Sequence, residues 1–425
     1  MSARREAADA GGRPAQTGSG MPPSLALGIA GFCSSISWQA VVPVLPLYLA
    51  QLGYSTSAIG VVAGLFSVTM AVTELQAGRL AAAFGRRRVL LNGYVANALC
   101  LSLVAAAHGR AFVTGSLAAA GAARGIIVPP LHATVAHSTA ASARGRAFGL
   151  FWLWTSFAAL SGPAMGGLLA ARYGYRAAFV LAALFSLVAL ALIGMFTRPS
   201  PEPRTGEAAG AHEIEGGGRA AGGLSALLSD PAVVGLAVST LLCYSLSGIW
   251  ATFLPLYAAH RGVPVQTIGL IFAAQGGAYA LMQLPTGRLI RPERGRWMVA
   301  SGIAGVAAVE LAVRLAQAAP ALIAAGALFG VAMGVMPVTL TTLVTWRVPP
   351  ARYTAAMSIY NAAIDFGLFA GPLLGAAVAR LDLAAPFALA LPLGLAAVAL
   401  SLRTDHGRAA APGGIASADA VPGSH

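Results

Sequence analysis

The sequence predicts an all-α membrane protein with twelve transmembrane helices in two pseudo-symmetric six-helix bundles. Three observations support this fold class. Of the 425 residues, 57% are hydrophobic and only 10% are charged, with a mean hydropathy of +0.74, whereas soluble domains carry roughly 25% charged residues. Apolar segments of about 20 residues recur along the chain, which is enough to cross a hydrocarbon core of about 30 Å. Short motifs also recur at one fixed spacing of 209 residues.

Apolar length and helix-breaking residues place each span to within about four residues. The first bundle, residues 24–197, is predicted to hold spans at 24–49, 57–80, 88–107, 111–136, 146–171 and 176–197. The second bundle, residues 231–402, is predicted to hold spans at 231–258, 266–290, 297–317, 320–346, 353–379 and 385–402. Residues 198–230 are rich in Pro, Gly and charge and are expected to form a flexible cytoplasmic linker. Residues 1–23 and 403–425 are expected to be disordered cytoplasmic tails.

The positive charge of the chain predicts its orientation. All 27 basic residues are arginines, and they lie at the ends of apolar segments rather than on one contiguous basic face. With both termini in the cytoplasm, 20 arginines lie on the cytoplasmic side and five on the other, as the positive-inside rule requires. We therefore expect a multi-pass protein of the bacterial plasma (cytoplasmic) membrane that has no nucleic-acid partner.

The fixed spacing indicates an internal duplication. Gly287-Arg288-Leu289 lies 209 residues after Gly78-Arg79-Leu80, and we call this distance the repeat spacing. It also relates Pro46-Leu47-Tyr48 to Pro255-Leu256-Tyr257, Ile59-Gly60 to Ile268-Gly269, and Gly162-Pro163 with Gly166 to Gly371-Pro372 with Gly375. Four matches in one register predict two parallel repeats, the arrangement from which many secondary transporters form a binding site near the membrane midplane.

The stretch after the second span resembles the loop 2–3 signature of the major facilitator superfamily, Gly-x-Leu-x-Asp-x-x-Gly-Arg-Arg. Its matching residues are Gly78, Leu80, Gly85, Arg86 and Arg87, and Arg79 lies within it. The resemblance extends over residues 24–402. It implies that these residues pack and anchor a cytoplasmic gate. The position of the signature Asp is Ala82, so the carboxylate lock associated with that family is absent from this motif.

The fifth span resembles the signature of proton-coupled exporters in that family, at Gly162, Pro163, Gly166 and Gly167 in "SGPAMGG". Gly371, Pro372 and Gly375 repeat the pattern in span eleven. Proline removes one backbone hydrogen bond, and glycine lets a neighbouring backbone approach closely. The resemblance implies export of a small amphipathic or drug-like compound by proton antiport. Proton-coupled uptake and a non-transporting sensor on the same fold are the alternatives.

Other functional classes lack their sequence signatures. The chain contains no GxSxG, no HExxH and no lysine-containing phosphate loop, so it is not expected to be an enzyme or an ATP-driven pump. The cysteines, Cys33, Cys100 and Cys243, are far apart within apolar segments, which favours a role in the core over a metal site. No cofactor is expected. The expected partners are a small-molecule substrate, protons and the lipid bilayer, and the protein is expected to be monomeric.

Ionisable residues within the spans are candidates for proton coupling, because each costs about 2.5–3.5 kcal/mol to insert near the bilayer centre. In the family, spans two, four and eleven are neighbours at the interface between the halves, and Arg124 and Asp365 lie on spans four and eleven. Glu74, one turn before Gly78, is expected to reach the cytoplasmic gate and is the next candidate for the coupling acid, and a polar residue at a helix end is the alternative. Asp365 facing Arg124 would form a coupling pair, and a static buried contact is the alternative. Glu310 and Arg314, four residues apart on span nine, are expected to form a local ion pair, with the Arg314 side chain extending outward.

Polar and aromatic residues on spans that line the cavity in this family are candidates for substrate contact. They are Trp38, Gln39, Trp152, Trp154, Tyr244, Trp250, Gln275 and Asn361. Many tryptophans with few charges suit a largely apolar, partly aromatic solute. The alternative for each is a contact with lipid or with a neighbouring helix.

Overall fold

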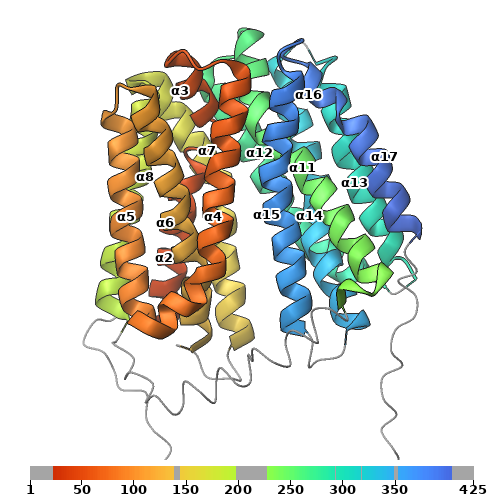
Figure 1. Cartoon of the computed structure of the whole chain (residues 1–425), viewed down its shortest axis with the longest axis horizontal. Helices are drawn as coiled ribbons and strands as arrows, with labels where there is room; N and C mark the ends of the chain where they lie inside the picture. The colour runs from red at the N-terminus through yellow and green to blue at the C-terminus, as the bar shows by residue number, and fades with distance from the viewer. Residues whose placement is uncertain are drawn as a thin grey trace, which may run out of the picture.

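The all-α, multi-pass membrane fold predicted from the sequence is confirmed; the count of twelve spans and the cytoplasmic position of both termini stay predictions. A computed structural model describes residues 23–137, 144–197, 227–291, 293–316, 318–348 and 353–403. Within these residues every regular element is a helix. Figure 1 shows two groups of helices side by side, one from each half of the chain. Of the predicted tails (1–23 and 403–425) and linker (198–230), residues 1–22, 198–226 and 404–425 lie outside the described residues. Pro23 and Arg403, placed in the tails by the sequence, begin and end helices.

The helices follow the predicted spans closely. The N-terminal half contains α2 (Pro23–Gln39), α3 (Leu45–Gln51), α4 (Thr56–Phe84), α5 (Arg86–Ala106), α6 (Arg110–His137), α7 (Arg144–Tyr173) and α8 (Arg176–Phe196). The C-terminal half contains α11 (Pro231–His260), α12 (Val265–Leu289), α13 (Gly295–Val313), α14 (Ala319–Arg347), α15 (Tyr353–Val378), α16 (Ala385–Ala388) and α17 (Ala390–Arg403). Ten spans among the described residues are long and apolar enough to cross a membrane.

The first predicted span is divided into two helices. Residues 40–44 form turns between α2 and α3, where Pro43 and Pro46 lack the N–H groups that a continuous helix would use. Since α3 has seven residues it cannot cross alone, and α2, with 17, is at the lower limit of the length that crosses a membrane. The α2–α3 segment therefore follows the predicted first span as a broken helix.

The helix packing repeats at the spacing that the sequence predicted. In the N-terminal half, Gly121 and Gly125 of α6 lie directly against the carbonyl oxygens of Phe66 and Met70 of α4. In the C-terminal half, Gly330 and Gly334 of α14 lie in the same way against Gln275 and Tyr279 of α12. The repeat spacing relates each of these residues to its counterpart. Close backbone approach through small residues drives membrane-helix packing, and here both halves use it at equivalent positions.

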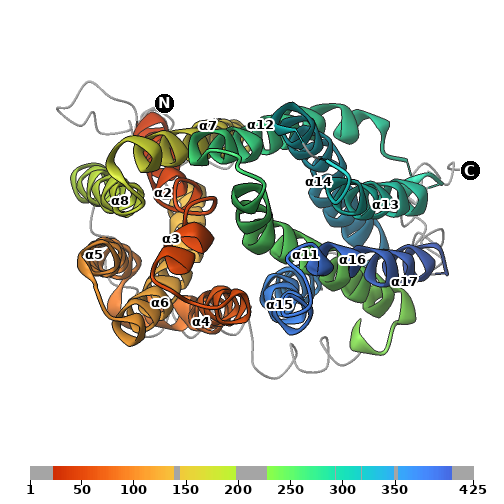
Figure 2. The same cartoon turned by 90° about the horizontal axis from the view of Figure 1, so that it is seen from above.

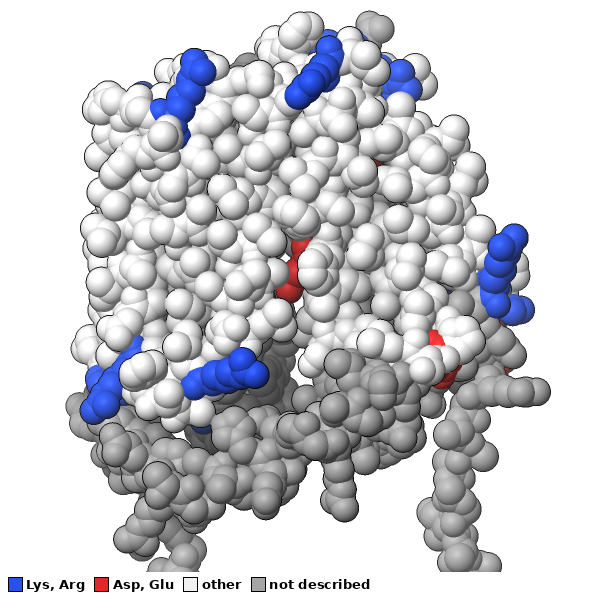
Figure 3. All heavy atoms as spheres, viewed as in Figure 1, with Lys and Arg blue, Asp and Glu red and all other residues white. Residues whose placement is uncertain are grey.

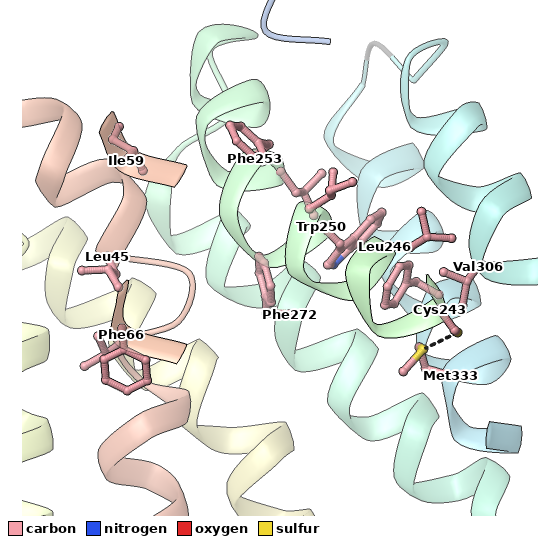
Figure 4. Close-up of a cluster of buried hydrophobic side chains, with 14 of the residues drawn as sticks. Leu45, Ile59, Phe66, Cys243, Leu246, Trp250, Phe253, Phe272, Val306 and Met333 are labelled. Carbon is pink, nitrogen blue, oxygen red and sulfur yellow. Dashed lines mark hydrogen bonds between the residues drawn. The ribbon is translucent and has the colours of Figure 1, made fainter. Parts of the chain in front are cut away.

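The core of the C-terminal half is built around α11. Trp250, Leu246 and Cys243 point from α11 toward Val306 and Met333 (Figure 4). Trp250 stacks on Phe329 with ring centroids 4.3 Å apart. Cys33 and Cys243 are buried, Cys100 is half-buried, and all three are free thiols, in agreement with their predicted role in the core.

Two glycine contacts join the halves on one side of the molecule. We call this the outer side; it holds Gly53 and Gly262, and the inner side holds Gly85 and is predicted to be cytoplasmic. A methyl group on Gly60 of α4 would lie 2.5 Å from the Pro372 oxygen of α15. A methyl group on Gly269 of α12 would lie 2.5 Å from the Pro163 oxygen of α7. Figure 2 shows both helix pairs, α4 beside α15 and α7 beside α12.

The same helix pairs separate toward the inner side. Among the described residues, a methyl group on Gly78 or Gly85 would meet no atom within 4 Å. Leu75 of α4 and Leu284 of α12, which are related by the repeat spacing, are 75% and 74% exposed. The described helices are therefore packed together on the outer side and separated on the inner side, and we call this arrangement the inner-open conformation.

The open surroundings of Gly78 make it a test of gate closure. Gly78→Leu is expected to leave folding and membrane insertion intact, because the space beside it is free in this conformation. It is expected to cripple transport, because the added side chain would obstruct packing when the inner side closes. Expression, thermal unfolding and transport of the variant check this. Unchanged transport would leave the motif with only a topological role.

Arg87 has a structural role that the motif alone did not indicate. Its Nε donates to the backbone oxygen of Thr197 at 2.9 Å, and its Nη2 donates to the backbone oxygen of Gly194 at 2.7 Å. These two carbonyl groups lie at the C-terminal end of α8, where the helix dipole favours a positive charge. Arg87 therefore joins the start of α5 to the last turn of α8.

Arg87→Ala is expected to lower the free energy of unfolding by about 1–2 kcal/mol, because two charge-assisted hydrogen bonds are lost. Thermal unfolding in detergent measures this. Arg79→Ala is the matched control, since Arg79 is exposed and its loss should leave the unfolding temperature unchanged. An equal effect of both substitutions would contradict the proposed cap.

Candidate functional site

A cavity of about 300 Å³ lies between the two halves. Its lining comes from α2 to α4 and α6 of one half and from α11, α12 and α15 of the other. The lining is largely apolar, with a few polar groups at Gln39, Ser67, Ser247, Thr252 and Gln275 and two charged groups at Arg124 and Asp365. A concave apolar site with few polar groups is typical of small-molecule binding.

The aromatic wall of the cavity is a stack of two rings. Trp38 of α2 and Phe66 of α4 lie parallel, with centroids 4.4 Å apart and an interplanar angle of 8°. The Arg124 guanidinium lies 5.6 Å from the Trp38 ring centroid, within the range of a cation–π interaction. Trp38 therefore contacts both Phe66 and the arginine of the cavity lining.

Arg124 is held by its own half of the protein. Its Nη1 donates to the backbone carbonyl oxygen of Ser34 in α2 at 3.3 Å, in addition to its contact with Trp38. Asp365 projects from α15 of the opposite half into the same cavity. Among the described residues, no ion pair within 4 Å joins Arg124 to Asp365. In this inner-open conformation, the predicted pair faces the same space without direct contact.

Glu74 lies close enough to Asp365 and Arg124 to interact with both electrostatically. It occupies α4 one turn from Met70, which lines the cavity. Figure 3 shows acidic atoms at mid-height, where the two halves face each other. The structure therefore brings the three predicted coupling residues into one neighbourhood; their role in coupling stays a prediction.

Gln275 is positioned by Trp250. The Trp250 Nε1 donates to Gln275 Oε1 at 2.8 Å, which leaves the Gln275 amide N–H groups available as donors. Trp250 itself is buried in the C-terminal core. Trp250 is therefore linked to the cavity indirectly, through its hydrogen bond to Gln275.

Of the eight predicted substrate residues, Trp38, Gln39 and Gln275 line the cavity. The other five lie elsewhere in this conformation. Trp154 packs against Gly28 and Phe32 of α2, and Tyr244 lies among Tyr279 and Tyr360 inside the C-terminal half. Trp152 is 53% exposed on α7, and Asn361 is exposed on α15.

The glycines predicted to pack helices make contacts of two kinds: within one half and between the two halves. Gly162 and Gly166 of α7 lie against Gln39, the last residue of α2, and Ala40, which follows it, within one half. Gly167 faces the other half, where a methyl group on it would lie 2.9 Å from the Gly269 Cα. The C-terminal counterparts Gly371 and Gly375 pack on Ser245 and Phe253 of α11.

Several residues of the cavity lining could not be recognised from the sequence. Phe66, Ser67 and Met70 of α4, with Ser247 and Thr252 of α11, line the cavity but are apolar or weakly polar residues typical of any membrane helix. The duplication could have identified Phe66, because the repeat spacing pairs it with Gln275. The two halves therefore present an aromatic ring and an amide at equivalent positions.

The ion pair expected between Glu310 and Arg314 is wrong. Glu310 is fully buried, and neither of its carboxylate oxygens has a hydrogen-bond partner among the described residues. Arg314 is the residue that ends α13, so its long side chain can leave the helix end toward a more polar region.

Curated relatives of similar length are multidrug resistance proteins. The multidrug resistance protein MdtG of Citrobacter koseri is 28% identical over 360 residues, covering 82% of this chain and 86% of the relative. MdtG of Serratia proteamaculans is 27% identical over 365 residues, with 82% and 84% coverage.

Solved structures support the fold. A bacterial homologue of the human lysosomal transporter Spinster, in an inward-facing and unoccupied conformation, has a TM-score of 0.68 at 14% identity, covering 90% of this chain and 94% of that one. A variant of the nucleoside transporter NupG has a TM-score of 0.70 at 13% identity, with 90% and 98% coverage.

The sequence profile of the Major Facilitator Superfamily matches residues 27–309 and 236–422, which together span most of the chain. The repeated glycine packing, the inter-half cavity and the multi-pass helical architecture agree with this match. The chain belongs to the Major Facilitator Superfamily and is a multi-pass membrane transporter rather than an enzyme.

Proposed function

We propose that this transporter exports small amphipathic, drug-like compounds across the bacterial plasma membrane by proton antiport. The observation that carries the proposal is the cavity itself, which holds Arg124 and Asp365 on opposite halves and is closed on the outer side. The proposed partners are the small-molecule substrate, protons and the surrounding lipid, with the monomer as the working unit and no cofactor.

Coupling follows from the placement of charge on two halves that move relative to each other. When Asp365 is ionised, its attraction to Arg124 favours an approach of the halves; when it is protonated, that attraction is lost. A proton taken up from one side therefore changes the free energy of closing the inner side. Glu74, which interacts electrostatically with both groups, would adjust the same balance.

The substrate class follows from the lining of the cavity. The stacked rings of Trp38 and Phe66 offer an aromatic surface, and aliphatic side chains make up most of the remaining wall. Such a surface favours apolar and aromatic solutes over sugars. The relatives named as multidrug resistance proteins support an exporter of this kind.

The direction of transport has a specific alternative. Uptake by proton symport uses the same fold and the same cavity, and a nucleoside transporter is among the structural neighbours. An opening toward the cytoplasm is compatible with both directions. The alternatives differ in whether substrate moves against or with the proton.

Two assays test the proposal. Expression in an efflux-deficient bacterial host should raise resistance to some members of a panel of amphipathic drugs. In proteoliposomes, a pH gradient should drive those compounds in the direction opposite to proton movement. Movement with the proton would favour the symporter, and no gradient-driven movement of any panel member would refute the proposed coupling.

A further inference from the structure

Toward the inner side, the two halves separate along two clefts that are related by the duplication. One lies between α4 and α15, below the contact of Gly64 with Leu373 and Phe369; the other lies between α7 and α12, below the contact of Gly277 with Leu160. We call them the α4–α15 cleft and the α7–α12 cleft. Figure 1 shows α4 and α15 diverging toward the inner side of the molecule.

The apolar rims of the two clefts are equivalent. Leu75 lies three helical turns from Gly64 on the same face of α4, and Leu284 is its counterpart on α12, with exposed fractions of 75% and 74%. Phe366 of α15 and Phe157 of α7 are related by the repeat spacing, with exposed fractions of 53% and 51%. Each cleft therefore presents one leucine and one phenylalanine on facing helices.

The acidic groups break this equivalence. Glu74 lies beside Leu75 on α4, whereas the corresponding residue beside Leu284 is Gln283. Asp365 lies beside Phe366 on α15, whereas the corresponding residue beside Phe157 is Ser156. Both acids thus lie on the two helices that border the α4–α15 cleft, with Asp365 in the lining of the cavity to which that cleft leads. Figure 3, which views the molecule from the side, shows acidic atoms reaching the surface between the halves.

The cation of the cavity does not neutralise both acids. The Arg124 guanidinium already contacts the backbone oxygen of Ser34 and the face of Trp38. It is also a single positive charge near two carboxyl groups. The Asp365 carboxyl group has no hydrogen-bond or ion-pair partner among the described residues. The α4–α15 cleft therefore joins an apolar rim to an acidic interior.

We infer that the α4–α15 cleft is a lateral access route by which amphipathic amines pass from the inner leaflet of the bilayer into the cavity. The inference rests on the proposed function and adds the substrate class and its source. The apolar body of the amine passes between Leu75 and Phe366, while its ammonium group meets Glu74. An ammonium group is costly in hydrocarbon, so an acid at the rim lowers the barrier to leaving the interface. The α7–α12 cleft has the same apolar rim without an acid.

The duplication provides a matched pair of plugging variants. Leu75→Trp fills the α4–α15 cleft and Leu284→Trp fills the α7–α12 cleft, at equivalent and equally exposed positions. Any obstruction of inner-side closure should affect both variants alike. A difference between them therefore reports the access route rather than the gate.

The experiment uses the full-length protein in proteoliposomes with dansylcadaverine, a fluorescent amphipathic amine, and its uncharged N-acetyl derivative. Leu75→Trp is expected to lower the initial rate of dansylcadaverine transport at least about tenfold relative to Leu284→Trp, equivalent to about 1.4 kcal/mol in the barrier. For the N-acetyl derivative the two variants are expected to be equal, because neither cleft offers that probe a charge to meet.

A pair of charge variants provides a second measurement that does not depend on bulk. Glu74→Gln installs the residue of the other cleft and is expected to lower the preference for the amine over its N-acetyl derivative. Gln283→Glu installs the acid in the α7–α12 cleft and is expected to make amine transport less sensitive to Leu75→Trp. Both are compared with the wild type, and thermal unfolding of each variant verifies that it is folded.

Equal slowing of the amine by Leu75→Trp and Leu284→Trp would overturn the access route, as would the absence of slowing by either. Wild-type transport of the N-acetyl derivative without the amine would overturn the amine class. If the wild type moves neither probe but confers drug resistance, the inference fails and the proposed function stands. If it also moves no compound of the drug panel, the proposed function itself has failed.

Discussion

Asp365→Asn is expected to abolish transport driven by a pH gradient while sparing exchange of a neutral substrate. Asparagine resembles the protonated carboxyl group in shape and charge, so the variant is held in one charge state and cannot carry a proton. Exchange requires no net proton movement and depends on the cavity, whose aromatic wall of Trp38 and Phe66 is left intact. Gradient-driven transport and counterflow in proteoliposomes measure the two activities separately.

Arg124 provides the companion test of the same mechanism. Arg124→Ala is expected to damage both activities, because it removes the cation that faces Asp365 and the contacts with Trp38 and Ser34. Arg124→Lys is expected to restore part of the activity, since it keeps the charge but loses the planar guanidinium. Full pH-driven transport by Asp365→Asn would place the coupling acid elsewhere, with Glu74 next because of its interaction with the same two groups.

Gly269→Leu is expected to prevent closure of the outer side and to abolish transport. A methyl group at this position would already lie 2.5 Å from the Pro163 oxygen and 3.0 Å from the Gly167 Cα. Overpacking costs about 1–3 kcal/mol, and about 1.4 kcal/mol shifts an equilibrium tenfold. The inner-open state would therefore lose about one to two orders of magnitude in population to states with an open outer side.

Accessibility of the cavity from outside measures this shift. A cysteine introduced at Ser67, which lines the cavity, should react with a membrane-impermeant thiol reagent from the outer side in Gly269→Leu but not in the parent. Gly115→Leu is the matched control, because Gly115 is exposed on α6 with free space around it. Equal labelling of parent and variant would show that the α7–α12 contact does not seal the outer side.

Much of the fold could be predicted from the sequence because the membrane imposes strong local constraints. Backbone groups in hydrocarbon must be satisfied within a helix, so apolar length and proline positions placed the helices near their observed bounds. The repeat spacing identified the pseudo-symmetry, and the glycines it relates occupy equivalent contacts in both halves. Gly60 and Gly269, which the repeat paired, each meet the proline carbonyl of the opposite half.

The candidate site was predictable only in part. Arg124, Glu74 and Asp365 were identified because a charge in a membrane span is costly and rarely without a role, and the structure brings them into one neighbourhood. Trp250 and Trp154, like Trp38, are tryptophans within predicted spans, and the sequence does not distinguish the three. In the structure, Trp250 and Trp154 pack inside their own halves. Which face of a helix a tryptophan occupies relative to the cavity depends on helix rotation, and a weakly amphipathic membrane helix does not encode rotation in its polarity pattern.

The sequence by itself determined the class of protein, the order of the spans, the duplication and the set of intramembrane charges, because hydropathy, arginine placement and repeat spacing are properties of the chain. Only the tertiary structure decided which side is closed, that Arg124 binds the Ser34 oxygen rather than Asp365, and that both acids border the α4–α15 cleft. The physical reason is that these features arise from contacts between helices far apart in the sequence, whose energies depend on side-chain packing across the interface of two similar halves.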